Sequence, residues 1–207
     1  MAEGDGAERV GPDAVGDDEE DRLDAQKKSF VFAERLTPKA QERRAVFVEE
    51  VAKVPPEKRV YVDQCGLDNT LSYPWGWSRR GRRCPGVRLG HKTQRISVMA
   101  ALYQGQLVAP LTFTGSYDAA LVEAWLEQHL LPELQAGQVV ILDNAAFHRH
   151  PHLRALLATK GCALLPLPPY SPDLNHIEPQ WNSLKIKVAL DTQIYPSFHE
   201  KVDAAFL

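Results

Sequence analysis

Residues 95–188 alternate short apolar runs with amphipathic segments of helical period, and this alternation restricts the possible folds more than any other feature of the chain. The first two runs, RISVMAALY and QLVAPLTFTG, flank Gln104-Gly105, which suits a two-residue hairpin turn. Helical segments separate the later runs, so the later strands can pair in parallel. The expected strands cover residues 59–66, 95–103, 106–115, 138–144 and 162–168, and the expected helices 118–134, 151–161 and 176–188.

This order of elements predicts an α/β fold with a mixed sheet, in which antiparallel hairpin strands are followed by parallel strands and helices cover both faces. Asp118 is placed to cap the start of the helix over 118–134, and Gly161 to end the helix over 151–161. The apolar face expected for the helix over 118–134 consists of Leu121, Val122, Trp125, Leu126 and His129.

Charge divides the chain into an acidic N-terminal tail and a mildly basic body. Residues 1–24 hold ten Asp and Glu against two Arg, whereas residues 25–207 hold 22 Lys and Arg against 17 acids. Because an acidic, glycine-rich segment without aromatic residues buries little apolar surface, we expect the tail to be disordered. A helical lead-in over 25–60, a central domain over 61–190 and a C-terminal segment over 191–207 are expected to follow.

The sequence excludes several classes of protein. No apolar run approaches the roughly 20 residues that cross a bilayer, and the N-terminus has no apolar stretch that could act as a signal peptide. We therefore expect a cytoplasmic protein without a membrane partner. Cys65, Cys84 and Cys162 are odd in number and form no CxxC pair, which predicts free thiols and argues against a disulfide framework or a cysteine-based zinc site.

Three acids stand at positions that suggest chemistry. Asp63 and Asp143 each close an apolar run, and Glu178 falls in the first turn of the last helix. If the strands at 59–66 and 138–144 are neighbours, both aspartates emerge at one edge of the sheet, where open α/β sheets build their sites. Converging carboxylates repel one another unless hard divalent cations neutralise them. Two such ions about 3.5–4 Å apart can activate a water or hydroxyl group and stabilise the leaving oxygen of a phosphodiester.

Each acid also has a structural interpretation. An aspartate at the end of a strand is often only a turn or cap residue, and Glu178 could form a capping box with Asn175.

The sequence resembles the DDE transposases of bacterial insertion sequences, in the branch related to mariner elements. The matching blocks are VYVDQCGLDN, YPWGWSRRGRRC, TQRISVMAAL, ILDNAAFHR and LPPYSPDLNHIEPQWNSLK, and the last is the most specific. There are 34 residues between Asp143 and Glu178, a spacing typical of that branch. The resemblance extends from about residue 27 to about residue 190.

This resemblance implies a ribonuclease H-like catalytic domain over 61–190, with Asp63, Asp143 and Glu178 as a catalytic triad that binds two Mg²⁺ or Mn²⁺ ions. The family cuts double-stranded DNA at transposon ends and joins the freed 3′-hydroxyl to target DNA, usually at TA. The expected reaction is in-line phosphoryl transfer without a covalent nucleophile on the protein. We also expect a homodimer on DNA.

A basic segment is the candidate DNA-contacting surface. No acid lies between Asp68 and Asp118, and most basic residues of that stretch fall within 78–95, just after two tryptophans. Cations beside aromatic side chains suit phosphates and unstacked bases, although a solvated loop is the plain alternative. On the last helix, Lys185 and Lys187 either touch phosphate or only form a solvated face. The predicted DNA contacts are Trp75, Trp77, Arg79, Arg80, Arg82, Arg83, Arg88, Lys92, Arg95 and Lys185.

Other polar residues near the acids are assigned supporting or structural roles. Asn144 is expected to orient Asp143 or the backbone, and His148 either approaches the scissile phosphate or has a surface or capping role. Asp173 is interpreted as a turn or cap residue and Trp181 as core. The predicted supporting residues are Asn144, His148 and Asn175, whereas His148, His150 and His152 lack the partners of a zinc site.

The sequence departs from the family pattern at three places. Gln64 stands where relatives usually have an acid, and His176 replaces the customary proline before the last helix, which could loosen the helix start. Residues 1–24 do not resemble the helix-turn-helix modules that read transposon ends, so we expect the catalytic half alone. The alternatives are an inert relic that only binds nucleic acid through 75–95 and a structural protein that dimerises through 25–60.

Overall fold

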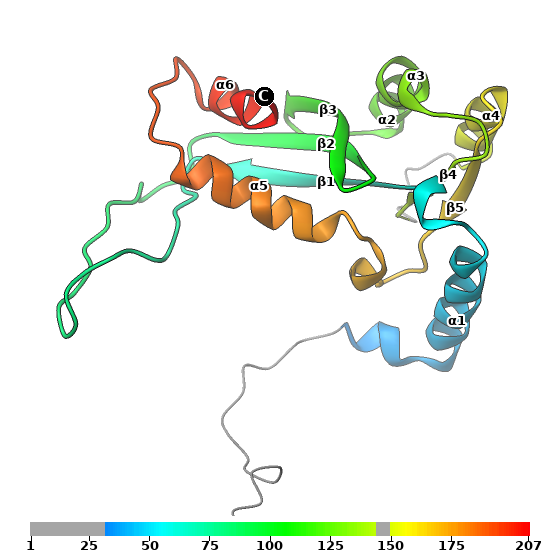
Figure 1. Ribbon diagram of the computed structural model, residues 1–207, viewed down its shortest axis with the longest axis horizontal. Helices are drawn as coiled ribbons and strands as arrows, with labels where there is room; N and C mark the ends of the chain where they lie inside the picture. The colour runs from blue at the N-terminus through cyan, green and yellow to red at the C-terminus, as the bar shows by residue number, and fades with distance from the viewer. Residues whose placement is uncertain (1–31, 144–149) are drawn as a thin grey trace, which may run out of the picture. The chain divides into compact units, whose positions relative to one another are not determined.

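Five strands form one mixed sheet in the computed structural model, which describes residues 32–143 and 150–207 (Figure 1). The order across the sheet is β3-β2-β1-β4-β5; β1 pairs antiparallel with β2, and β2 with β3, whereas the β1–β4 and β4–β5 pairs are parallel. The predicted mixed sheet and the predicted neighbourhood of the first and fourth strands are confirmed. The strands are β1 (Arg59–Asp68), β2 (Arg95–Tyr103), β3 (Gln106–Thr114), β4 (Val139–Leu142) and β5 (Ala163–Pro166).

Helices cover both faces of this sheet, as predicted. The acidic tail and the start of the lead-in, up to residue 31, lie outside the described residues. The helices are α1 (Pro38–Ala52), α2 (Ala119–Trp125), α3 (Leu131–Glu133), α4 (His150–Thr159), α5 (Glu178–Leu190) and α6 (Phe198–Asp203), with a π-helical turn η4 (Leu126–Leu130) and 3₁₀ turns η2 (Ala33–Leu36), η3 (Pro56–Lys58), η5 (Pro172–Leu174) and η6 (Ala204–Phe206).

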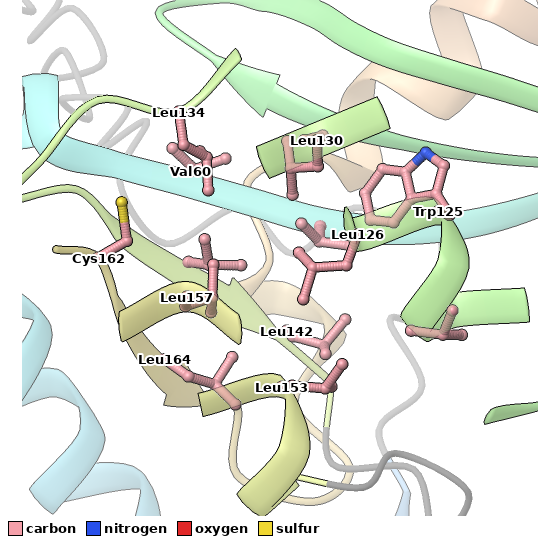
Figure 2. Packing of buried hydrophobic residues seen from close by; sticks show 14 of the residues in the cluster. Val60, Trp125, Leu126, Leu130, Leu134, Leu142, Leu153, Leu157, Cys162 and Leu164 are labelled. Atoms are coloured by element: carbon pink, nitrogen blue, oxygen red, sulfur yellow. The ribbon is translucent and has the colours of Figure 1, made fainter. Parts of the chain in front are cut away.

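One core lies between the sheet and the helices α2 and α4. Figure 2 shows Val60 and Leu142 of the sheet meeting Trp125, Leu153 and other apolar side chains. Trp125 is 1% exposed, and its indole N–H donates to the carbonyl of Ala109 at 2.8 Å, so its polar atom is satisfied inside the core.

A second core fills the opposite face, where α1, α5 and α6 pack. Because side chains alternate along a strand, Tyr61 and Ile141 point to this face while Val60 and Val140 point to the other. Trp181 of α5, which runs alongside β1 (Figure 1), packs here. Val202 of α6 is 0% exposed, so the segment after residue 190 contributes to this core.

Three predicted local signals are confirmed. Gln104 and Gly105 have φ angles of 48° and 82°, as a two-residue hairpin turn with both central residues left-handed requires. The Asp118 carboxylate accepts the Leu121 N–H at 2.9 Å and caps α2. Gly161, with φ 68°, follows the end of α4. The three cysteines are free thiols.

The predicted helix over 118–134 is not one regular α-helix. It is α-helical to Trp125, passes through the π-helical turn η4 and resumes as α3. The wider turn places Leu130, at 0% exposure, in the core, while His129 is exposed. Assigning His129 to the apolar face was therefore wrong.

None of the helices in the described ranges is both long enough and apolar enough to span a bilayer.

Candidate active site

The register between β1 and β4 sets the positions of the two aspartates. The two strands pair in parallel from Arg59 opposite Val139 to Tyr61 opposite Ile141. Two residues beyond this last pair come Asp63 on β1 and Asp143 just past the end of β4. Asp63 shares the face of Tyr61, on which α5 packs.

The prediction that Asp63 ends its strand was wrong. β1 continues to Asp68, because β2 pairs with it as far as Arg95 and satisfies its backbone. It is β4 that ends, at Leu142, and the β1–β4 pairing stops at Tyr61 and Ile141, before Asp63. The two aspartates thus mark the end of one strand and the middle of its neighbour.

Glu178 joins them from the start of α5. Its backbone N–H donates to the carbonyl of Asn175 at 3.2 Å, and Pro179 occupies the first turn of the helix. A cavity of about 450 Å³ is lined by all three predicted triad acids, together with the proline-rich segment before α5. The structure therefore brings Asp63, Asp143 and Glu178 to one pocket.

The capping-box interpretation of Glu178 was wrong. The residue before α5 that occupies the cap position is Ile177, and it makes no side-chain cap. The Asn175 side chain instead donates from Nδ2 to the carbonyl of Val62 at 3.3 Å, which ties the loop to β1. Glu178 is thus held at the pocket by loop contacts and not by a cap.

Asp63 is the most perturbed of the three acids. Its pKa is raised to about 6, mainly by burial and to a lesser extent by the charges of Glu178 and Asp143, against the lowering effect of hydrogen bonds from the Gln64 backbone and the Trp181 side chain. The indole N–H of Trp181 donates to Asp63 Oδ2 at 2.9 Å. Trp181 is core, as predicted, but no pattern in the sequence indicates that its N–H orients a candidate ligand.

A raised pKa at Asp63 predicts a stability that depends on pH. Below about pH 3 the carboxyl is largely protonated in both the folded and the unfolded protein. As pH rises, the unfolded chain releases the proton near its ordinary pKa of 3.8 but the folded chain only near 6. The metal-free protein should thereby lose on the order of 2–3 kcal/mol of unfolding free energy by about pH 7.

Asp63→Asn removes this ionisation while keeping the shape of the side chain. In EDTA, we expect the variant to be more stable than wild type at about pH 7.5 and equally stable at about pH 3, as urea denaturation would measure. If the wild-type protein is the more stable of the two at the higher pH, burial of the Asp63 carboxylate does not raise its pKa as stated.

The chemical type of the three acidic side chains suits a hard divalent cation. All three groups offer carboxylate oxygens, and a cation would offset the burial and mutual repulsion that penalise the charge of Asp63. Asn175 Oδ1 is a buried acceptor with no hydrogen-bond partner among the described residues, so a further donor near this loop would be stabilising. Within 32–143 and 150–207, however, no three His, Cys, Asp or Glu side chains lie close enough to share one ion.

Residues 69–94 connect β1 to β2 as an exposed loop that projects beyond the strand ends (Figure 1). Trp75 and Trp77 are 78% and 102% exposed, so both rings are accessible to a ligand. Asn69 closes the base of the loop, donating to the Thr93 hydroxyl at 2.7 Å. The loop's arginines are exposed as well, which suits the predicted DNA contact and equally the solvated-loop alternative: Arg79, Arg80, Arg82, Arg83 and Arg88.

Two residues predicted to contact DNA, Lys92 and Arg95, contact residues of β1 instead of standing free in the loop. Lys92 forms an ion pair with Asp68 at 2.9 Å, and the hydroxyl of Thr70 donates to the same carboxylate; together these lower the pKa of Asp68 to about 2. The Arg95 guanidinium lies over Gly66, where an added Cβ would stand within 3 Å of it. Both side chains brace the base of the loop.

The two lysines of α5 have different surroundings. Lys185 is half-buried and close enough to Cys65 to counter, in part, the burial that raises the pKa of that thiol to about 12. Lys187 donates from Nζ to the carbonyl of Ala205 at 2.7 Å. This hydrogen bond of the exposed Lys187 ties the C-terminal turn to α5, and both interpretations of Lys187 stay predictions.

Asp173 links the lead-in helix to the loop before Glu178. Arg44 donates to its two oxygens at 2.8 and 3.2 Å, and Arg35 donates to one of them at 3.1 Å. The hydrogen bonds from Arg44, more than the two arginine charges, hold the pKa of Asp173 below its usual range. Its interpretation as only a turn or cap residue missed this role, because the partners lie more than 125 residues away in sequence.

Some of the remaining predicted site residues lie outside the part of the chain that the structure describes. Asn144 and His148 lie outside the described residues, and so does the side chain of His150. His152 Nε2 lies 3.6 Å from Glu123 Oε2. No pattern in the sequence singles out Tyr117, but burial and then the charges of Asp143 and Asp63 raise its pKa to about 12.

The sequence of residues 58–199, more than half of the chain, matches the profile of the DDE superfamily endonucleases. The chain belongs to the DDE superfamily endonuclease family. The carboxylates of this DDE domain that share a pocket are therefore the natural candidates for the acids after which the superfamily is named. No curated protein matches the chain in sequence.

Solved structures of Mos1 transposase share the fold of this DDE domain. The Mos1 paired-end complex with the left transposon end has a TM-score of 0.64 at 17% identity, over 90% of this chain and 58% of the Mos1 chain. The mariner Mos1 paired-end complex with Mg has a TM-score of 0.63 at 19% identity, over 92% and 60% of the two chains. The Mos1 catalytic domain alone gives 0.53 at 15%, over 86% and 82%.

This likeness establishes a ribonuclease H-like fold, in agreement with the sheet order and the helices on both faces. The chain spans about three fifths of the length of the Mos1 chains in the paired-end complexes.

Proposed function

We propose that this chain is the catalytic domain of a DNA transposase, which cleaves DNA strands at transposon ends and joins them to target DNA with the help of two Mg²⁺ or Mn²⁺ ions. The single observation that carries the proposal is the convergence of Asp63, Asp143 and Glu178 on one pocket in a DDE superfamily domain. Mos1 was solved on transposon-end DNA and with Mg and Mn, which favours the same substrate and ions here.

Within this proposal the three carboxylates hold the ions. Bound divalent ions would activate the attacking water or 3′-hydroxyl and stabilise the leaving oxygen of the phosphodiester. Trp181 keeps Asp63 oriented through its hydrogen bond to Oδ2. The exposed cations of the loop over 69–94 would position the DNA backbone without reading its sequence. The proposal extends to a homodimer on DNA and to TA target sites.

Nicking of supercoiled plasmid tests the proposal. The purified chain should convert supercoiled DNA to the nicked form in Mn²⁺, and EDTA should stop the reaction. A pre-cleaved transposon end with a free 3′-hydroxyl should be joined to a plasmid under the same conditions. Protein that binds DNA and Mn²⁺ yet neither nicks nor joins it would overturn the proposal.

A non-catalytic protein that only binds nucleic acid is the second candidate. The observation in its favour is the exposure of Trp75, Trp77 and the neighbouring arginines on one loop. In that case wild type and Asp143→Asn would be equally inert in the nicking assay and would shift DNA equally, in a manner weakened by salt.

A further inference from the structure

His176 and Tyr61 form a stacked pair beside the pocket. Their ring centroids lie 4.6 Å apart and the ring planes are tilted by only 10°. Tyr61 is fixed within the sheet at 6% exposure, whereas His176 is exposed on the loop before α5. Tyr61 stands two residues before Asp63, and His176 two residues before Glu178. The stack therefore joins the two chain segments that carry these acids.

The neighbouring residue strengthens this junction. Asn175 donates from its side chain to the carbonyl of Val62, so two consecutive loop residues, 175 and 176, grip two consecutive residues of β1. The α5 start has no side-chain cap to fix it independently. These two contacts with β1, together with the buried Ile177 and the hydrogen bond from Trp181 to Asp63, set the position of Glu178 relative to Asp63.

We infer that His176 is a positioning residue whose aromatic face, stacked on Tyr61, holds Glu178 level with Asp63. The inference rests on the proposed function, which makes Glu178 and Asp63 ligands of the same ions. It also explains the departure from the family pattern: an aromatic contact with β1 replaces the rigidity of the customary proline, while Pro179 supplies the proline of the first helical turn.

A role for the ring nitrogens of His176, as ligands or hydrogen-bond donors, can be separated by experiment from a role for its aromatic face. His176 also lines a cavity of about 350 Å³ with Glu178 and Asp173, so its ring nitrogens could serve as ligands or donors there. Stacking requires an aromatic ring of any kind, whereas ligation requires the nitrogens. The variants His176→Phe and His176→Asn separate the two, because the first keeps the ring and the second keeps a polar nitrogen.

In the nicking assay, the Mn²⁺ concentration at half-maximal rate is the informative quantity, because a misplaced ligand weakens ion binding whereas a smaller folded fraction does not. We expect His176→Asn to raise it roughly three- to tenfold, in line with the contribution of an aromatic pair, and His176→Phe to retain nearly the wild-type value. His129→Asn, an exposed histidine on η4, is the matched control and should change nothing. If His176→Phe is as impaired as His176→Asn, the ring nitrogens matter and the inference is wrong.

Amide hydrogen exchange of the metal-free protein tests the positioning without any activity. In His176→Asn, the N–H groups of Glu178 and Gln180, which donate to Asn175 and Ile177, should exchange several-fold faster, while those of α4 stay unchanged. His176→Phe should protect them as wild type does. Equal exchange in all three proteins would overturn the inference. If the wild-type protein does not nick DNA, the proposed function fails. The exchange result then still decides whether His176 positions Glu178.

Discussion

Asp143→Asn should lower Mn²⁺-dependent nicking by at least about a hundredfold. Asp143, just past the end of β4, lines the same pocket as Asp63, and an amide has no charge with which to hold a divalent ion. Loss of an outer partner of a metal ligand already reduces activity or affinity by about 10–100-fold, so loss of the ligand itself should reduce it more. Initial rates on supercoiled plasmid measure the effect.

A matched control separates this loss from unfolding. Glu133→Gln makes the same carboxylate-to-amide change at an exposed position at the end of α3 and should nick at the wild-type rate. Urea denaturation in EDTA should give Asp143→Asn a stability no lower than wild type. Nicking by Asp143→Asn within threefold of wild type would remove Asp143 from the proposed triad.

Replacing Arg79, Arg80, Arg82 and Arg83 together by alanine should weaken DNA binding by at least about thirtyfold at about 0.1 M salt. At about 0.5 kcal/mol or more per surface contact, four lost contacts amount to about 2 kcal/mol, and each 1.4 kcal/mol is tenfold in affinity. The plot of log affinity against log salt should also become less steep, by up to about 3.6 for duplex DNA. Fluorescence anisotropy at several salt concentrations measures both quantities.

Net charge alone could mimic this result, so the control removes four other exposed cations: Lys39, Arg43, Lys53 and Lys160. These lie on α1 or just after α1 and α4, away from the loop over 69–94. We expect this variant to keep most of the affinity and the salt slope. Equal losses in the two quadruple variants would mean that the loop is only a solvated surface.

The parts of the fold that depend on local chemistry could be predicted from the sequence. The Gln104-Gly105 turn, the Asp118 cap and the alternation of strands and helices follow from backbone preferences and periodicity, which short segments encode by themselves. The meeting of Asp63 with Asp143 followed from one assumption about strand order, which the sheet confirms.

The features that depend on residues far away in the sequence could not be predicted. β1 continues past Asp63 because β2 pairs with it as far as Asp68. No residue near Asp63 indicates this pairing. The hydrogen bond from Trp181 to Asp63 and the ion pair between Arg44 and Asp173 join segments more than 100 residues apart. Positions such as Trp181 are recognisable as apolar, but the direction of an indole N–H is decided by packing.

The central claim is that Asp63, Asp143 and Glu178 together hold divalent ions, and calorimetric titration of the DNA-free protein with Mn²⁺ tests it most directly. Wild type should bind Mn²⁺, and each of Asp63→Asn, Asp143→Asn and Glu178→Gln should weaken binding at least about tenfold, because each removes one charged ligand. Binding that is unchanged in any one of the three variants, or absent in wild type at millimolar Mn²⁺, would contradict the account.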